Sequence, residues 1–157
     1  MENEVRSARD LRPGANVGGF ELVKRIHQGG MAVIWEAKRS DLTLPAVVKI
    51  PMIGEGDEAS SIVGFEMEQM IMPTLTGRHV PKVFGMGDIT ALPYIAMERI
   101  VGKTLAEKAG KLPMDPAEAA VLAGKIAVGL IDLHRQQVIH FDLKPANIIF
   151  RDDTGDA

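Results

Sequence analysis

The chain has 157 residues, 46% of them apolar, and is long enough to bury the core of one domain. Its 18 basic and 21 acidic residues give a formal net charge of −3, so no general basic field could hold nucleic acid or an anionic membrane surface. The absence of cysteine excludes disulfides and thiolate metal sites, and it is compatible with the cytoplasm, where we expect the protein.

The first 18 residues are charged and lack the apolar run of a signal peptide. We expect residues 1–18 to form a polar, mobile extension. No stretch of the sequence reaches the roughly 18 apolar residues of a membrane span, so no membrane segment is expected in this chain.

The next segment predicts a β-hairpin followed by a buried strand. Phe20, Leu22 and Ile26 fall on one face of the run 20–28, a Gly-Gly pair breaks the run, and "AVIWEAK" resumes it. The strand "AVVKI" then carries a single charge, Lys49. A lysine in a buried strand needs an anionic partner, although on an edge strand it could reach water instead.

A helix is predicted after the loop "GEGDEASS". Asp57 or Ser60 is its candidate N-cap, and the helix extends to about Leu75, with Pro73 disturbing its last turn. Glu68 falls on the apolar face of this helix. A carboxylate there needs a cation, which favours pairing with Lys49 over a solvated glutamate.

Two short strands, "PKVFGMG" and "PYIAME", and the connector "MERIVGKTL" lead to a long amphipathic helix. Asp115 is its expected N-cap and Pro116 its first residue. Its apolar face is expected to contain Leu122, Ile126, Leu130 and Leu133. Strands with one helix, followed by a helical region, predict an α+β fold with two lobes.

The segment 140–147, "HFDLKPAN", precedes a last predicted strand, "NIIF". Asp142 can accept a hydroxyl proton, Lys144 supplies a cation for a migrating phosphoryl group, and Asn147 offers an amide oxygen to Mg²⁺. Each residue alone fits an ordinary turn or surface position. Their joint spacing predicts phosphoryl transfer.

This segment resembles the catalytic loop of eukaryotic-like (Hanks-type) serine/threonine protein kinases, whose pattern is His-Arg-Asp-Leu-Lys-Pro-x-Asn. Other segments follow in the family's order. "IHQGGMAVIWEAK" is similar to the glycine-rich loop, in the style of bacterial members, "AVVK" to the lysine strand, "FEMEQM" to the glutamate helix and "YIAMERIVGKTL" to the hinge. The resemblance covers about residues 19–150. It implies a two-lobed kinase fold in which 19–101 form an antiparallel five-stranded N-lobe with one helix and the hinge, and 102–157 begin the helical C-lobe.

The resemblance also implies ATP and Mg²⁺ as cofactors and a protein substrate phosphorylated on serine or threonine. Asp142, Lys144 and Asn147 would be catalytic, with Asn147 as the metal ligand. Lys49 would bind the α- and β-phosphates, and Glu68 would pair with it. The implied nucleotide-binding residues are Ile26, Gly29, Gly30, Ile34, Val47, Lys49, Glu68, Met97, Glu98, Ile100 and Ile149.

Within that set, Ile34, Val47 and Ile149 would sandwich the adenine. In the hinge, Met97 would be the gatekeeper, and the backbone of Glu98 and Ile100 would bond the adenine edge.

Several positions depart from the family pattern. His27 and Ala32 stand where the first and third loop glycines are usual, so only Gly29 is retained, and the stiffer loop puts nucleotide affinity in question. Phe141 replaces the arginine before the catalytic acid, and we expect it to pack against apolar neighbours. The sequence ends at Ala157 before an Asp-Phe-Gly segment, whose aspartate is the main Mg²⁺ ligand in the family. We therefore expect this chain to be inactive alone and to expose apolar surface on helix 115–135.

Two other functions remain open. A pseudokinase or nucleotide-binding regulatory module is favoured by the altered glycine loop. A small-molecule phosphotransferase of the same fold is also possible, but Lys144 and Pro145 argue against it.

Overall fold

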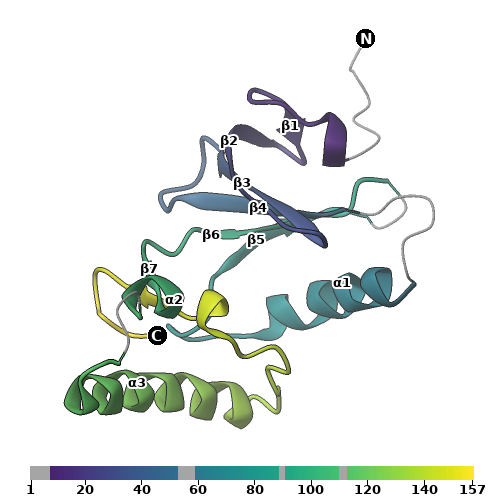
Figure 1. Ribbon diagram of the computed structural model, residues 1–157. Coiled ribbons are helices and arrows are strands. Elements are labelled where there is room, and N and C mark those ends of the chain that lie inside the picture. The colour runs from purple at the N-terminus through teal and green to yellow at the C-terminus, as the bar shows by residue number, and fades with distance from the viewer. Residues whose placement is uncertain (1–7, 53–58, 89–90, 110–112) are drawn as a thin grey trace. The chain divides into compact units, whose positions relative to one another are not determined.

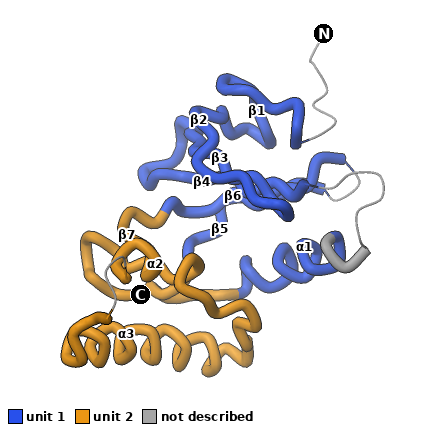
Figure 2. The backbone as a smooth tube through the Cα atoms, viewed as in Figure 1, with its two compact units in different colours: residues 1–74, 81–99 blue, residues 75–80, 100–157 orange. Residues whose placement is uncertain are grey.

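The computed structural model describes residues 8–52, 59–88, 91–109 and 113–157 (Figure 1). The chain divides into two compact units (Figure 2). The first comprises Met1–Thr74 with Pro81–Arg99, and the second comprises Leu75–Val80 with Ile100–Ala157. The break at Arg99 lies close to the expected boundary at residue 101, whereas the assignment of residues 75–80 to the second unit was not expected.

The first unit contains an antiparallel sheet of six strands in the order β1-β2-β3-β4-β6-β5. Its strands are β1 (Asn16–Val17), β2 (Phe20–Gln28), β3 (Ala32–Lys38), β4 (Ala46–Pro51), β5 (Val83–Met86) and β6 (Ile95–Glu98). Five of the six match the predicted strands. The expected five-stranded sheet lacked β1, because a strand of two residues carries no alternation that a sequence pattern could show.

The expectation of a polar, mobile extension is wrong for residues 8–18. Leu11 and Val17 are both buried, at 3% exposure, in the core of the sheet. Gly18 and Gly19, with φ of +57° and +89°, form the two-residue turn between β1 and β2, a conformation that favours glycine at both positions. Apolar burial and a glycine turn therefore hold this segment on the sheet.

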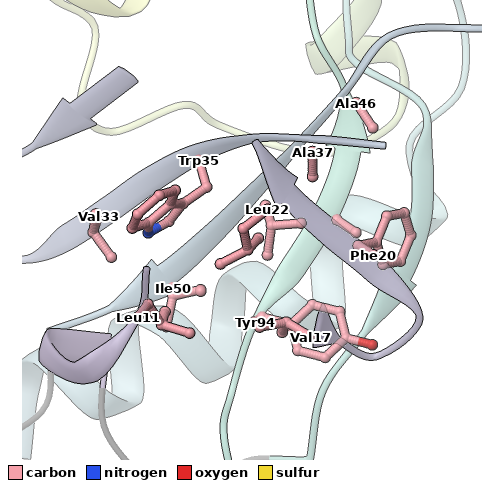
Figure 3. Packing of buried hydrophobic residues seen from close by; sticks show 12 residues of the cluster. Leu11, Val17, Phe20, Leu22, Val33, Trp35, Ala37, Ala46, Ile50 and Tyr94 are labelled. Carbon is pink, nitrogen blue, oxygen red and sulfur yellow. The ribbon is translucent and has the colours of Figure 1, made fainter. Parts of the chain in front are cut away.

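One face of the sheet carries the hydrophobic core (Figure 3). Residues of β3 alternate, so that Val33, Trp35 and Ala37 are buried, and their register partners on β4 lie on the same face. The buried cluster consists of Leu11, Val17, Phe20, Leu22, Val33, Trp35, Ala37, Ala46, Val48, Ile50, Tyr94 and Ala96. The opposite face of β3 and β4 remains for other contacts.

Strand β2 departs from the simple alternation that the sequence predicts. Phe20 and Leu22 are fully buried, but Ile26 is 41% exposed. The pairing with β3 shifts register between Leu22 and Lys24 and again between Arg25 and His27. Each shift adds an unpaired residue and changes the face of the residues that follow it. Ile26 therefore does not share the buried face with Phe20 and Leu22, although the alternation of the sequence predicted that it would.

Helix α1 (Ala59–Ile71) ends before the expected position near Leu75, and a 3-10 turn, Met72–Thr74, follows it. Pro73 lies in this turn and so disturbs the end of the helix, as predicted. Of the two cap candidates, Asp57 lies outside the described residues and Ser60 lies within the helix. The Gln69 amide donates to the Gly87 and Tyr94 carbonyls, at 2.8 and 3.1 Å. These bonds attach α1 to the segments that flank β5 and β6.

The second unit combines a two-stranded sheet with helices. Its elements are β7 (Gly102–Thr104), α2 (Leu105–Lys108), α3 (Pro116–Arg135) and β8 (Ile149–Arg151). Strand β8 corresponds to the predicted last strand, whereas its antiparallel partner β7 lies in the predicted connector. Within the described ranges, no helix is both long and apolar enough to cross a bilayer.

Helix α3 begins as the sequence predicts. The Asp115 carboxylate accepts hydrogen bonds from the N–H groups of Ala117 and Glu118, and Pro116 is the first helical residue. Leu122 is buried, and the other predicted core positions of the helix are half-buried. Val121, Val128 and Ile131 of this helix are exposed, but they lie outside the predicted core face, so the expected exposure of that face is not observed.

Candidate active site

The predicted ion pair between Lys49 and Glu68 is confirmed. Lys49 lies on the central strand β4, paired with Ile34 of β3 and Ile95 of β6. Its ammonium donates to both carboxylate oxygens of Glu68 on α1, at 2.7 and 2.6 Å. The two side chains are only 26% and 29% exposed, which limits screening by water. The pair therefore fixes the ammonium over the face of the sheet opposite the core.

Three other predicted nucleotide-binding side chains share that face. Residues paired across antiparallel strands lie on the same face of a sheet. Ile34 pairs with Lys49, and Val47 pairs with Met97. An apolar patch consequently surrounds the base of the Lys49 side chain, as an adenine-binding surface requires.

The hinge residues are divided between the units. The backbone N–H of Glu98 donates to the Lys82 carbonyl at 2.7 Å and is therefore used within the first unit. Ile100 and Ile149 belong to the second unit. The adenine sandwich and the hinge contacts therefore stay predictions.

Gly29 and Gly30 lie in the turn between β2 and β3, as predicted. The Gly29 N–H donates to the Ala32 carbonyl at 3.0 Å, which closes the turn. A Cβ built on Gly30 would have no heavy atom within 4 Å. The backbone at Gly30 is therefore open to an approaching group.

In the second unit, a tight turn precedes the predicted catalytic acid. Phe141 has a φ of +58°, and the Asp142 N–H donates to the His140 carbonyl at 2.7 Å. This i to i+2 bond around a residue with positive φ marks a γ-turn of the strained form. The expectation that Phe141 packs against apolar neighbours is wrong for the described chain, because its side chain is 91% exposed.

The predicted catalytic residues Asp142, Lys144 and Asn147 lie together. The Lys144 ammonium is 2.8 Å from Asp142 Oδ2, and the Asn147 amide donates to the same oxygen at 2.9 Å. A second bond from the Asn147 amide reaches the Asp142 backbone carbonyl, also at 2.9 Å. The Asp142 side chain is 66% exposed, so a substrate hydroxyl could approach it.

Both neighbours favour the ionised form of the acid. The hydrogen bond from Lys144, and then that from Asn147, hold the pKa of Asp142 below the usual value of an aspartic acid. Asp142 therefore stays a carboxylate, the form that can accept a proton or orient a hydroxyl nucleophile.

The donor set at Asn147 fits a weakly held Mg²⁺. Because the Asn147 NH₂ group faces Asp142, its carbonyl oxygen is the atom suited to a metal. In the described part of the chain, no group of three or more His, Cys, Asp or Glu side chains could hold a metal ion. Mg²⁺ commonly binds through one or two side chains together with phosphates and water, so these residues fit such a site only with a phosphate ligand present.

Two contacts of the catalytic loop were not anticipated from the sequence. His140 had no assigned role, yet its Nδ1 lies 3.3 Å from the Asp142 backbone nitrogen. When Nδ1 carries no proton, it can accept a hydrogen bond from the Asp142 N–H. The Leu105 N–H donates to the Ile148 carbonyl at 2.8 Å and joins the loop to α2. The segment "GKT" is too short to show that β7 would pair with β8 and bring these residues together.

Comparison with known proteins places these features in context. The protein kinase domain family matches residues 20–156. The serine/threonine-protein kinase PrkC of Bacillus subtilis (strain 168) is 27% identical over 133 residues, which are 84% of this chain and 20% of PrkC. PknL of Mycobacterium tuberculosis (strain ATCC 25618 / H37Rv) is 27% identical over 147 residues, 92% of this chain and 37% of PknL. The chain thus spans a fifth to little more than a third of the length of these curated relatives.

Solved structures support the fold. The Mycobacterium tuberculosis PknI kinase domain matches with a TM-score of 0.74 at 19% identity, covering 93% of this chain and 60% of that one. The apo form of PpkA-294 matches with a TM-score of 0.78 at 18% identity, covering 93% and 59%. The kinase-like fold, with its antiparallel N-lobe sheet, is therefore confirmed.

Proposed function

Because the chain belongs to the protein kinase domain family, we propose that it carries the ATP-binding and phosphoryl-transfer residues of a serine/threonine protein kinase. The observation that carries this proposal is the hydrogen-bonded set of Asp142, Lys144 and Asn147. Relatives named as serine/threonine-protein kinases support the choice of a protein hydroxyl as the acceptor. We place the reaction in the cytoplasm, because the chain lacks cysteine and binds a nucleotide in this proposal.

Each residue has a distinct part in the proposed reaction. Lys49, oriented by Glu68, binds the phosphate chain of ATP. Asp142 accepts a hydrogen bond from the serine or threonine hydroxyl through the carboxylate oxygen that Lys144 and Asn147 leave open. Lys144 then neutralises negative charge on the migrating phosphoryl group. When bound, Mg²⁺ supplies further neutralisation of the phosphates, and Asn147 is the residue that would hold it.

A second function has support from one observation. The glycine loop retains only Gly29, with His27 and Ala32 at the flanking positions. A loop of this kind is compatible with nucleotide binding without transfer, as in a regulatory module. The Lys144-Pro145 pair still disfavours a small-molecule phosphotransferase.

Radiolabel transfer from γ-labelled ATP tests the proposal in the full-length gene product. We expect Mg²⁺-dependent labelling of serine or threonine that falls about 10²-fold or more in Asp142→Asn, since the general base is lost. Asp153→Asn, an exposed aspartate of the same unit, is the matched control and should retain activity. Equal labelling by wild type and Asp142→Asn contradicts the catalytic assignment. Tight ATP binding without any labelling favours the regulatory module.

A further inference from the structure

His27 is the next-to-last paired residue of β2 before the glycine turn. Register pairs His27 with Ile34 of β3, and Ile34 with Lys49 of β4. Because paired residues of antiparallel strands share a face, His27 and Lys49 flank Ile34 on the face opposite the core. Two strand spacings separate their backbones, about 10 Å.

A β-bulge sets the direction of this histidine. The register moves from Arg25 opposite Trp35 to His27 opposite Ile34, so Ile26 is the extra residue. Bulges of this kind change the direction of a side chain at the end of a strand. The His27 Nε2 lies 3.2 Å from the position of a Cβ built on Gly29, so the imidazole lies alongside the backbone of the turn.

The imidazole is available to a ligand, whereas nearby charged groups are already engaged. His27 is exposed, and among the described residues it makes no hydrogen bond or ion pair. On the same sheet face, Lys24 pairs with Glu36 at 3.5 Å. The Lys49 ammonium is held by Glu68, and the Arg25 guanidinium donates to Gln28. On this face Lys24 and Lys49 are thus each paired with a carboxylate, whereas the imidazole of His27 stays available to a ligand.

We infer that His27 is a phosphate-binding residue of the nucleotide site, an inference that rests on the proposed function. Glycine-rich loops bind phosphates through backbone N–H groups that glycine leaves accessible. With glycine absent at positions 27 and 32, fewer such approaches are possible. A ring N–H of His27 instead donates to an oxygen of the distal phosphates. Across the strands β2, β3 and β4, His27 and Lys49 lie on opposite sides of Ile34. The ligand class is a nucleoside di- or triphosphate, bound with selectivity over the nucleoside.

Calorimetric titration of this chain with MgATP, MgADP, AMP and adenosine tests the inference. We expect His27→Gly to weaken MgATP binding about tenfold, the loss of one hydrogen bond to a charged group, while adenosine affinity stays within about twofold. His27→Gln, which keeps a side-chain N–H donor, should retain most of the MgATP affinity. His134→Gln, a change at an exposed histidine of α3, is the matched control and should bind as wild type does.

The possible outcomes separate the explanations. Tighter or unchanged MgATP binding by His27→Gly overturns the inference, because the histidine then obstructs the site or is irrelevant to it. Equal weakening of MgATP and adenosine also overturns it, since that result indicates a disturbed fold. If His27→Gly does not fold, the same comparison is made with His27→Gln against His27→Leu, a shape-retaining change without a donor. A wild-type chain that binds no MgATP contradicts the proposed function, and this inference with it.

Discussion

The Lys49 ammonium donates to both carboxylate oxygens of Glu68, although the two residues are 19 positions apart and lie on different elements. A pair that is less than one-third exposed on both sides depends on each partner, because removing one leaves the other charge poorly solvated. We therefore expect the loss of either Lys49 or Glu68 to weaken both nucleotide binding and phosphoryl transfer.

In the full-length gene product, Lys49→Ala should lower phosphoryl transfer on the order of 10²-fold, as when one preorganised donor is removed. Glu68→Ala should act through the same lysine, so the double variant should be little worse than Lys49→Ala alone. Initial rates with γ-labelled ATP measure the cycle. Lys38 and Glu21 form a more exposed pair, at 65% and 49%, and their alanine variants are the control for a surface ion pair. If the loss of rate in the double variant equalled the product of the losses in Lys49→Ala and Glu68→Ala, coupling between the two residues would be ruled out.

The Lys49–Glu68 contact shows how far the sequence can be read. A single charge in an apolar strand and a single carboxylate on an apolar helix face each require a partner, and that requirement predicted the pair before any geometry was known. The N-terminal segment had no comparable signal. Its buried residues Leu11 and Val17 are six positions apart and follow no alternating pattern, and its strand has two residues. Only the Gly18-Gly19 pair could have indicated the turn.

Other misses have the same physical origin. The exposed position of Ile26 follows from two register shifts, which depend on the pairing of β2 with β3 and are invisible in the alternation of one strand. Phe141 was expected to pack because phenylalanine is usually buried. The hydrogen bond across the γ-turn instead fixes a backbone direction that leaves its ring exposed.

Lys144→Met should raise the pKa of Asp142 toward the usual value for aspartate, because the Lys144 hydrogen bond is the largest cause of its lowering. Asn147→Ala should raise it less. Because the pKa of Asp142 is lower in the folded state, its ionisation stabilises the fold at pH values above the unfolded-state pKa. This contribution is lost as the pH falls through the folded-state pKa. Carboxyl ¹³C shifts followed through an acid titration measure the effect. Glu107, whose pKa is lowered by Thr104, is the internal control and should not change. An unchanged titration of Asp142 in Lys144→Met would contradict the ion pair.

Gly18→Ala should destabilise the first unit strongly. A Cβ at Gly18 would overlap the hydroxyl group of Tyr94, and the φ of +57° already disfavours alanine. We expect a loss of about 2–4 kcal/mol, the sum of overpacking and left-handed backbone cost. Gly14→Ala is the matched control, because Gly14 has a φ of +87° but no atom within 4 Å of its Cβ position. Urea unfolding followed by Trp35 fluorescence gives both values, and equal losses would mean that Tyr94 contributes nothing.

Gln137→Gly should stabilise the second unit. Gln137 has a φ of +61° directly after α3, where the N–H groups of Gln137 and Val138 donate to the His134 and Leu133 carbonyls. This pattern is a Schellman motif with glutamine at the position that glycine prefers. Relief of the left-handed strain should raise the free energy of unfolding by about 0.5–1 kcal/mol after the entropy cost of glycine. Gln137→Ala retains the strain and should show no gain in urea unfolding. A loss of stability in Gln137→Gly would indicate that the glutamine side chain matters more than its backbone.

Phe141 bears on how the proposed kinase would be controlled. An arginine before the catalytic acid can bind a phosphorylated residue through charge-assisted hydrogen bonds, whereas phenylalanine cannot bind phosphate. We therefore expect the initial rate of the full-length gene product to change less than about tenfold when a phosphatase removes its phosphates. Because the Phe141 ring is 91% exposed, Phe141→Ala should keep both this rate and the free energy of unfolding, the latter within about 0.5 kcal/mol. Phe141→Arg should introduce sensitivity to the phosphatase, because the guanidinium can bind a phosphorylated residue. A fall of more than about tenfold in the wild-type rate after phosphatase treatment would show that another residue binds the phosphorylated residue. A loss of stability in Phe141→Ala would show that the ring packs against other side chains in solution.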